Sequence, residues 1–137
     1  MKQVFKFVLA CAVGVLPMSV GARDSEAVEV RKMIDKVNQH WQAENSPEVR
    51  SFWDNAVYHT GNMEAYFLTG NETYRAYSET WANYNQWKGA KSDNRAEWKY
   101  SYGESDQYVL FGDYQICFQT YTDLYNLAPD DKKIKRA

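Results

Sequence analysis

Residues 53–70 read WDNAVYHTGNMEAYFLTG, and the helical pattern of this stretch decides the expected fold class. It predicts a helix from about Asp54 to Thr69 that ends at Gly70, a residue suited to the left-handed conformation that closes many helices. Residues on one face recur at three- and four-residue spacing: Val57, Gly61, Ala65 and Leu68. Because two of these are small, we expect a neighbouring helix to approach this face closely.

Three further helices and the start of a fifth are predicted around this stretch. Residues 24–42 carry an apolar stripe at helical spacing, and the pattern breaks before Pro47. Another helix opens at Asn71, a good capping residue. A fourth begins at or just after Asp113, which is placed to cap it, and a fifth begins near Pro129. Since no segment alternates like a strand, the predicted fold class is all-α.

Aromatic residues mark a helix face and a long loop. The helix that opens at Asn71 carries a stripe of rings at positions 74, 77, 81 and 84, which favours a core face over a binding surface. Residues 88–111 lack helical periodicity and contain Trp98, Tyr100 and Tyr102. Loops of this length in a small domain are usually functional or disordered, and the rings argue against disorder.

The N-terminus has the pattern of a secretion signal. Lys2 and Lys6 precede an apolar run that is too short to span a bilayer, and small residues precede a predicted cleavage site after Ala22. We therefore expect a signal peptide over residues 1–22 and a secreted or periplasmic protein without a membrane span. A lipoprotein anchored through Cys11 is the weaker alternative. After cleavage Cys117 would be the remaining cysteine, and its apolar neighbours predict a buried side chain rather than a nucleophile.

Composition excludes several classes of function. A chain of 137 residues with net charge −2 allows one small domain and lacks the basic excess of a nucleic-acid-binding protein. No common nucleotide-binding, zinc-protease or serine-hydrolase motif occurs. His40 and His59 lie on different predicted helices, so we expect neither a metal site nor a cofactor. The aromatic content of 16% suits a core or a cleft that stacks sugar rings.

Two stretches hold the candidate site residues. In the first, Tyr58 and Gly61 lie one helical turn apart, and the glycine leaves room beside the tyrosine hydroxyl for a ligand or a helix backbone. Tyr58 and its neighbour His59 are therefore candidates for substrate binding, with a helix contact at Tyr58 as the alternative. In the second, Gln115 and Gln119 would share a helix face and present their amides to sugar hydroxyls.

Asp113 admits two interpretations. At a helix start, backbone N–H groups and the helix dipole would hold its carboxylate ionised, as a catalytic site can require. The same position is that of an ordinary N-cap, and the residue pattern alone favours the cap.

These stretches, together with Leu68–Asn71 and the segment of Trp81 and Trp87, resemble the N-terminal part of glycoside hydrolase family 105. That family comprises the unsaturated rhamnogalacturonyl hydrolases, relatives of the family 88 unsaturated glucuronyl hydrolases. The resemblance covers about residues 27–137. It rests on a W-x-x-x-x-Y-x-x-G run that continues into L-T-G, and on an Asp-initiated helix ending Q-T-Y-x-D-L-Y.

The resemblance implies an (α/α)6 toroid with a sugar site at one end. Twelve helices need well over the length available, so residues 23–137 are expected to form a truncated N-terminal part of about four helices plus the start of a fifth. Such an arc would expose apolar helix faces that a complete ring covers.

The resemblance also implies an activity, namely removal of a terminal 4,5-unsaturated uronic acid from pectin-derived oligosaccharides. An aspartic acid protonates C4, water adds at C5, and the resulting hemiketal opens. Asp113 matches the first active-site aspartate, which lies beside the acid/base, and Tyr58 matches a tyrosine of the sugar subsite. The principal acid/base matches no residue here, and Tyr114 stands where the family usually has a second Asp.

Three hypotheses therefore remain open. The first is an N-terminal portion of an unsaturated-uronide hydrolase, inactive alone. The second is a small exported helical module that binds saccharide or protein without catalysis. The third is another (α/α)6 enzyme, mannanase-like or lyase-like. The leaving sugar and the oligomeric state stay open.

Overall fold

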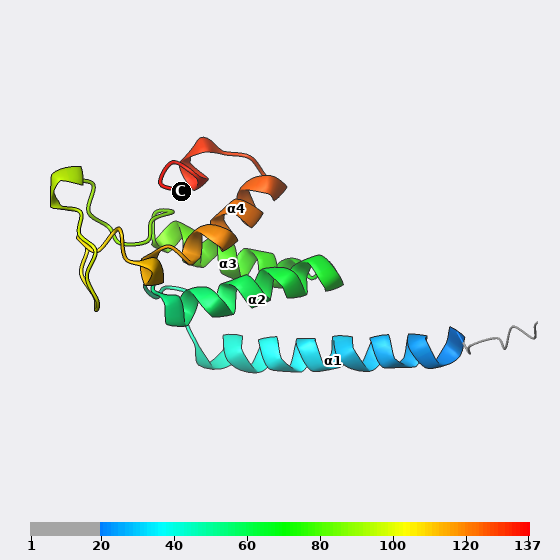
Figure 1. Cartoon of the computed structure of the whole chain (residues 1–137). Helices are drawn as coiled ribbons and strands as arrows, with labels where there is room; N and C mark the ends of the chain where they lie inside the picture. Colours follow the sequence, from blue (N-terminus) through cyan, green and yellow to red (C-terminus); the bar gives the residue numbers. More distant parts are fainter. Residues whose placement is uncertain (1–19) are drawn as a thin grey trace, which may run out of the picture.

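The computed structural model describes residues 20–137 (Figure 1). Its helices are α1 (Val20–Glu44), α2 (Trp53–Thr69), α3 (Glu72–Tyr84) and α4 (Cys117–Leu127). Three single-turn 3-10 helices complete the described part: η1 (Arg95–Glu97), η2 (Gly112–Tyr114) and η3 (Asp131–Lys133). These residues contain no strand, so the predicted all-α class is confirmed.

The N-terminal signal prediction falls largely outside the described part of the chain. Its positive residues, its apolar run and Cys11 lie among residues 1–19, and α1 begins at Val20. From Val20 onward, no helix combines the length and the apolar character needed to traverse a bilayer.

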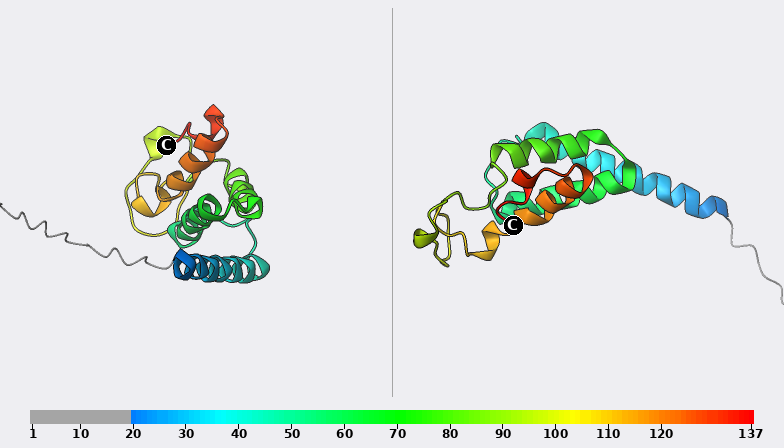
Figure 2. Two further views of the ribbon diagram at one scale, coloured as in Figure 1. Left: turned by 90° about the vertical axis from the view of Figure 1, so that its right-hand side faces the viewer. Right: turned by 90° about the horizontal axis from the view of Figure 1, so that it is seen from above.

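The helices form a short arc around α2. Figures 1 and 2 show α2 and α3 as an antiparallel pair, α4 packed on that pair, and α1 running along the opposite side of α2. The N-termini of α2 and α4 and the C-terminus of α3 therefore lie at the same end, where the long loop also projects (Figure 1).

Local chemistry sets the turn between α2 and α3 as predicted. Gly70 has φ 71° and its N–H donates to the Tyr66 carbonyl, which closes α2. The Asn71 side chain then accepts from the Thr73 N–H at 3.1 Å and caps α3. Both predicted boundaries are confirmed because neighbouring residues alone satisfy the free backbone groups.

The core is built around Trp81. Its indole is fully buried with Met63 of α2 and with Cys117, Tyr121 and Leu124 of α4. The predicted burial of Cys117 is therefore confirmed. The predicted core stripe of α3 is confirmed in part, because Tyr74 is also buried whereas Tyr84 at the end of the helix is exposed.

The predicted start of α4 is wrong by several residues. The helix begins at Cys117, and Asp113 lies in the preceding turn η2, where no side-chain cap forms. Tyr114 explains the shift, because its ring is buried at 4.8 Å from the Phe52 ring, which holds residues 112–114 in a separate turn. The predicted fifth helix is likewise only the turn η3, with Asp130 accepting from the Lys132 N–H.

Candidate functional site

One end of the arc collects the segments that the sequence analysis singled out. We define the loop end as the N-terminus of α2, the loop of residues 88–111 and the turn η2, which meet at the left of Figure 1. The loop folds back on itself through backbone bonds, including Ser92 N–H to Asp106 O at 2.9 Å and Lys99 N–H to Gln107 O at 2.8 Å. The predicted long, ordered loop is confirmed.

Tilted and edge-on rings pack together at the loop end. Phe52, Phe111 and Tyr114 pack as a small buried cluster with Ala90. The Tyr102 ring lies 5.3 Å from the Phe111 ring, yet 78% of the residue remains accessible. Aromatic faces that are held in place on one side and open on the other suit contact with sugar rings.

Asp113 lies in the turn η2, next to the aromatic residues of the loop end. It is half-buried between the buried residues Phe111 and Tyr114. The pKa of the Tyr100 hydroxyl is raised, chiefly by its hydrogen bond with Tyr102 and also by the negative charge of Asp113. The charge of Asp113 therefore acts on the exposed Tyr100 hydroxyl of the loop end.

Arg50 ties the loop to the start of α2. Its guanidinium lies 4.9 Å from the centre of the Phe52 ring and bridges Asp54 at 2.9 Å. It also pairs with Glu104 of the loop. Since all three charged groups are partly exposed, these pairs orient the loop more than they stabilise the fold.

The two predicted glutamines do not share a helix face. Gln115 precedes α4 and its amide donates to the Val109 carbonyl at 3.3 Å, whereas Gln119 lies in the first turn of α4. The prediction of a common face is wrong because it depended on a helix that began at Asp113. Both side chains are exposed, so each remains available to a ligand.

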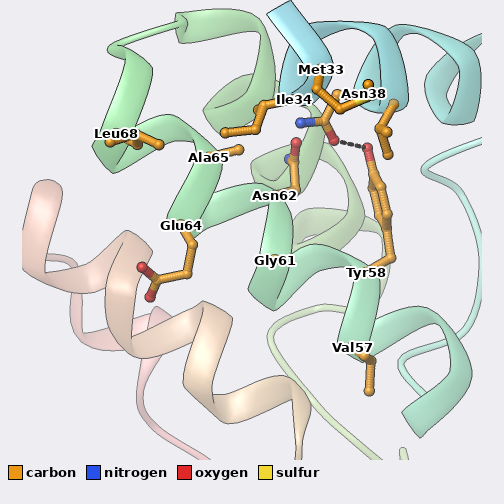
Figure 3. A pocket seen from close by; sticks show the side chains of 11 residues that line it. Met33, Ile34, Asn38, Val57, Tyr58, Gly61, Asn62, Glu64, Ala65 and Leu68 are labelled. Atoms are coloured by element: carbon orange, nitrogen blue, oxygen red, sulfur yellow. Dashed lines mark hydrogen bonds between the residues drawn. The ribbon is translucent and has the colours of Figure 1, made fainter. Parts of the chain in front are cut away.

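Tyr58 lies in a second region, between α1 and α2. Figure 3 shows its hydroxyl directed at Asn38 of α1, to which it donates at 3.0 Å, while it accepts from Gln42 at 3.1 Å. Its ring stacks on Trp41 with centroids 4.5 Å apart. Burial raises the pKa of Tyr58 to about 12, so the hydroxyl keeps its proton.

An open apolar groove surrounds Tyr58 instead of a close helix contact. This α1–α2 groove has a volume of about 590 Å³ and is lined mainly by apolar side chains: Met33, Ile34, Val37, Val57, Ala65 and Leu68. A Cβ placed on Gly61 would meet no atom within 4 Å. The predicted close approach at Gly61 is therefore wrong, whereas the expected uncovered apolar face is present (Figure 3).

His59 points the other way, into the core. It is 2% exposed, stacks on Trp81 at 4.0 Å and lies 3.1 Å from the Ser78 hydroxyl through Nδ1. The Ser78 hydroxyl also accepts from the Asn62 amide at 2.8 Å. Desolvation lowers the pKa of His59 to about 3, which keeps the ring neutral. The structure thus separates His59 from the surface that Tyr58 lines.

Sequence reasoning did not select Asp123 of α4. Burial raises the pKa of its carboxyl, and the charge of Glu64 on α2 raises it further. Figure 3 shows the Glu64 side chain directed toward α4. No sequence signal links these acids, because they lie in different helices. The described residues contain no group of three His, Cys, Asp or Glu side chains that could hold a metal ion.

Comparison with known proteins identifies the family. The model of Glycosyl Hydrolase Family 88 matches residues 26–137, and the chain belongs to this family. None of the curated proteins matches the chain.

Two solved structures share the fold of these helices. One is described as a glycosyl hydrolase family 88 protein from Bacteroides vulgatus, with 63% identity and a TM-score of 0.79 over 80% of this chain and 32% of its own. The other is described as a polysaccharide lyase, with 65% identity and a TM-score of 0.77 over 81% of this chain and 31% of its own. The chain spans about a third of the length of both. The four helices form part of a helical toroid, as the resemblance implied.

Proposed function

We propose that this chain is the N-terminal part of a secreted or periplasmic glycoside hydrolase that removes 4,5-unsaturated uronic acid from pectin-derived, rhamnogalacturonan-type oligosaccharides. The observation that carries the proposal is the loop end, where the charge of the half-buried Asp113 acts on the exposed Tyr100, whose ring packs against Tyr102, in a chain of family 88.

The proposed reaction is hydration of a vinyl ether. A protonated aspartic acid delivers its proton to C4 of the double bond, water adds at C5, and the hemiketal opens to release the leaving sugar. Such an acid stays protonated near neutral pH when a second carboxylate lies close by. We assign Asp113 this second, positioning role and assign the principal acid to no residue of this chain.

The remaining proposed site residues differ in how they can act. Tyr58 lines the α1–α2 groove, and Gln115 and Gln119 are exposed near η2, so all three can touch a saccharide. The buried His59 would act through Tyr58, whose ring lies 5.3 Å away. Because the proposed principal acid is absent, we expect the chain alone to be inactive.

A spectroscopic assay tests the proposal. The 4,5 double bond of an unsaturated rhamnogalacturonan disaccharide absorbs in the ultraviolet, so hydration lowers the absorbance. We expect loss of absorbance with the Bacteroides vulgatus relative, none with this chain, and strong slowing when the relative's aspartate aligned with Asp113 is changed to Asn. Turnover by this chain would contradict its inactivity, and an inert relative would contradict the substrate class.

The description of the second structure favours one alternative, cleavage of intact polysaccharide by a lyase. A lyase breaks the chain by elimination and creates the double bond, so absorbance rises. The sign of the absorbance change on polymer and on disaccharide therefore separates the two activities, and a binding module would produce neither.

A further inference from the structure

A second pocket opens behind the loop end, where three segments of the chain meet. Its walls come from residues 86–88, which follow α3, from the loop around η1 and from the C-terminal segment, which lies beside the start of that loop (Figures 1 and 2). The volume is about 440 Å³, within the range of small-molecule sites. None of the candidate site residues described above lines it.

The pocket is strongly basic in a chain whose net charge is −2. Five basic side chains and a single acid line it: Lys88, Arg95, Lys132, Lys135 and Arg136 with Asp93. Lys88 and Arg136 both pair with Asp93 at 2.6 Å. Lys132 pairs with Asp130 at 3.1 Å. One carboxylate inside the pocket therefore faces five cations, which leaves a local excess of positive charge.

Within the described part of the chain, two of the five basic side chains form no salt bridge. Among the described residues, Arg95 and Lys135 form no salt bridge, and Arg95 instead lies 5.3 Å from the centre of the Trp98 ring. Arg95 and Lys135 share the pocket with Asp93, whose pKa is lowered chiefly by its hydrogen bond with Lys88 and also by the charge of Lys135. A guanidinium and an ammonium that form no salt bridge can still attract an anion, and the guanidinium can bind a carboxylate through two parallel hydrogen bonds.

The Trp98 side chain on the pocket wall is held by a hydrogen bond and by the guanidinium groups of Arg95 and Arg136 over its ring. The Trp98 indole N–H donates to the Ser92 carbonyl at 3.0 Å, and the Arg136 guanidinium donates to the same carbonyl at 2.8 Å. Arg136 also lies 4.9 Å from the centre of the Trp98 ring. These contacts place the half-buried indole before any ligand arrives.

We propose that this basic pocket binds a carboxylate group of an acidic saccharide, with Arg95 and Lys135 holding the carboxylate and Trp98 contacting the sugar ring. The choice of a uronate over other anions rests on the proposed function. A rigid tryptophan beside unpaired cations matches a ligand that is both anionic and ring-shaped. The pocket thus forms a uronate-binding site separate from Asp113, able to hold one acidic unit of an oligosaccharide away from the reacting end.

A binding experiment on the chain tests this proposal without any turnover. Saturated galacturonic acid oligomers, neutral galactose oligomers and inorganic phosphate are titrated in parallel, and binding is followed by calorimetry and by tryptophan fluorescence. We expect saturable binding of the acidic oligomer that weakens with salt, and no binding of the neutral one. Phosphate that binds as tightly as the acidic oligomer would overturn the assignment to a saccharide.

Variants locate the binding. Arg95→Ala and Lys135→Ala should each weaken binding of the acidic oligomer about tenfold, because each removes one charge-assisted contact. Lys36→Ala on the exposed side of α1 is the matched control and should bind like the parent. If all three variants bound the acidic oligomer as tightly as the parent chain, the proposed site would be refuted. Because saturated oligomers cannot be hydrated, a failed absorbance assay with the relative leaves this result intact, and the two proposals fail separately.

Discussion

The buried His59 predicts a specific loss of stability in acid. In the folded chain its pKa is lowered to about 3 by desolvation, whereas an unfolded histidine titrates near its ordinary value of about 6.5. Below about pH 6.5 His59 therefore binds a proton in the unfolded state but stays neutral in the folded state until the pH approaches 3. Stability is highest above this range and falls as the pH drops from 6.5 toward 3.

The size of the effect follows from the same two values. Each pH unit inside the window costs about 1.4 kcal/mol, so lowering the pH from 7 to 4.5 should remove roughly 2–3 kcal/mol through His59 alone. No neighbour offsets this loss, because the groups around the ring are Ser78, the stacked rings of Trp81 and Tyr77, and the edge-on ring of Tyr58, none of which is a carboxylate. A small domain has a total stability of only about 5–15 kcal/mol, so the effect is large enough to measure.

Urea unfolding at pH 7 and at pH 4.5, followed by circular dichroism, measures this contribution. His59→Gln removes the titrating group, so the variant should be less stable at pH 7 but should lose roughly 2–3 kcal/mol less than the parent on acidification. His40→Gln removes the chain's other histidine from an exposed site and should behave like the parent. An equal loss in the parent and in His59→Gln would refute the argument from burial.

Three further outcomes follow from the geometry. Gly61→Ala should stabilise the chain by about 0.5–1 kcal/mol in thermal unfolding, since the helical site opens on free space, whereas Gly89→Ala should destabilise it because the new Cβ would collide with the Tyr114 carbonyl. Asp113→Asn should change the free energy of unfolding by less than about 0.5 kcal/mol, whereas Asn71→Ala should lower it by about 1 kcal/mol, because of these two residues only Asn71 caps a helix. A larger loss for Asp113→Asn than for Asn71→Ala would show that Asp113 caps a helix after all. Burial raises the pKa of the Cys117 thiol to about 12, so a thiol reagent should label it in urea but not in the folded chain, and rapid labelling of the folded chain would contradict its burial.

Features that depend on neighbouring residues were predictable from the sequence. Gly70 and Asn71 set the α2–α3 turn through hydrogen bonds that span two to four residues. The burial of Trp81 and Leu124 follows from helical spacing. The family resemblance rests on local motifs too, and the match over residues 26–137 confirms it.

The start of α4 shows where local reasoning stops. Asp113 has the chemistry of an N-cap, but the adjacent Tyr114 packs against Phe52, which precedes it by more than sixty residues. This distant contact holds η2 as a separate turn and moves the helix start to Cys117. Burial of the Tyr114 ring against a residue distant in the sequence outweighs a cap that is worth about 1 kcal/mol.

The sequence by itself determined the all-α class, the α2–α3 turn with its two caps and the family, because backbone hydrogen bonds and side-chain periodicity act over a few residues. Only the tertiary structure decided which side chains lose water and which charges meet. It buried His59 beside Trp81, left Gly61 facing an open groove, and joined Asp93 to Arg136 across the chain, which assembled the basic pocket. Desolvation and charge proximity depend on positions in space, and a linear pattern does not contain them.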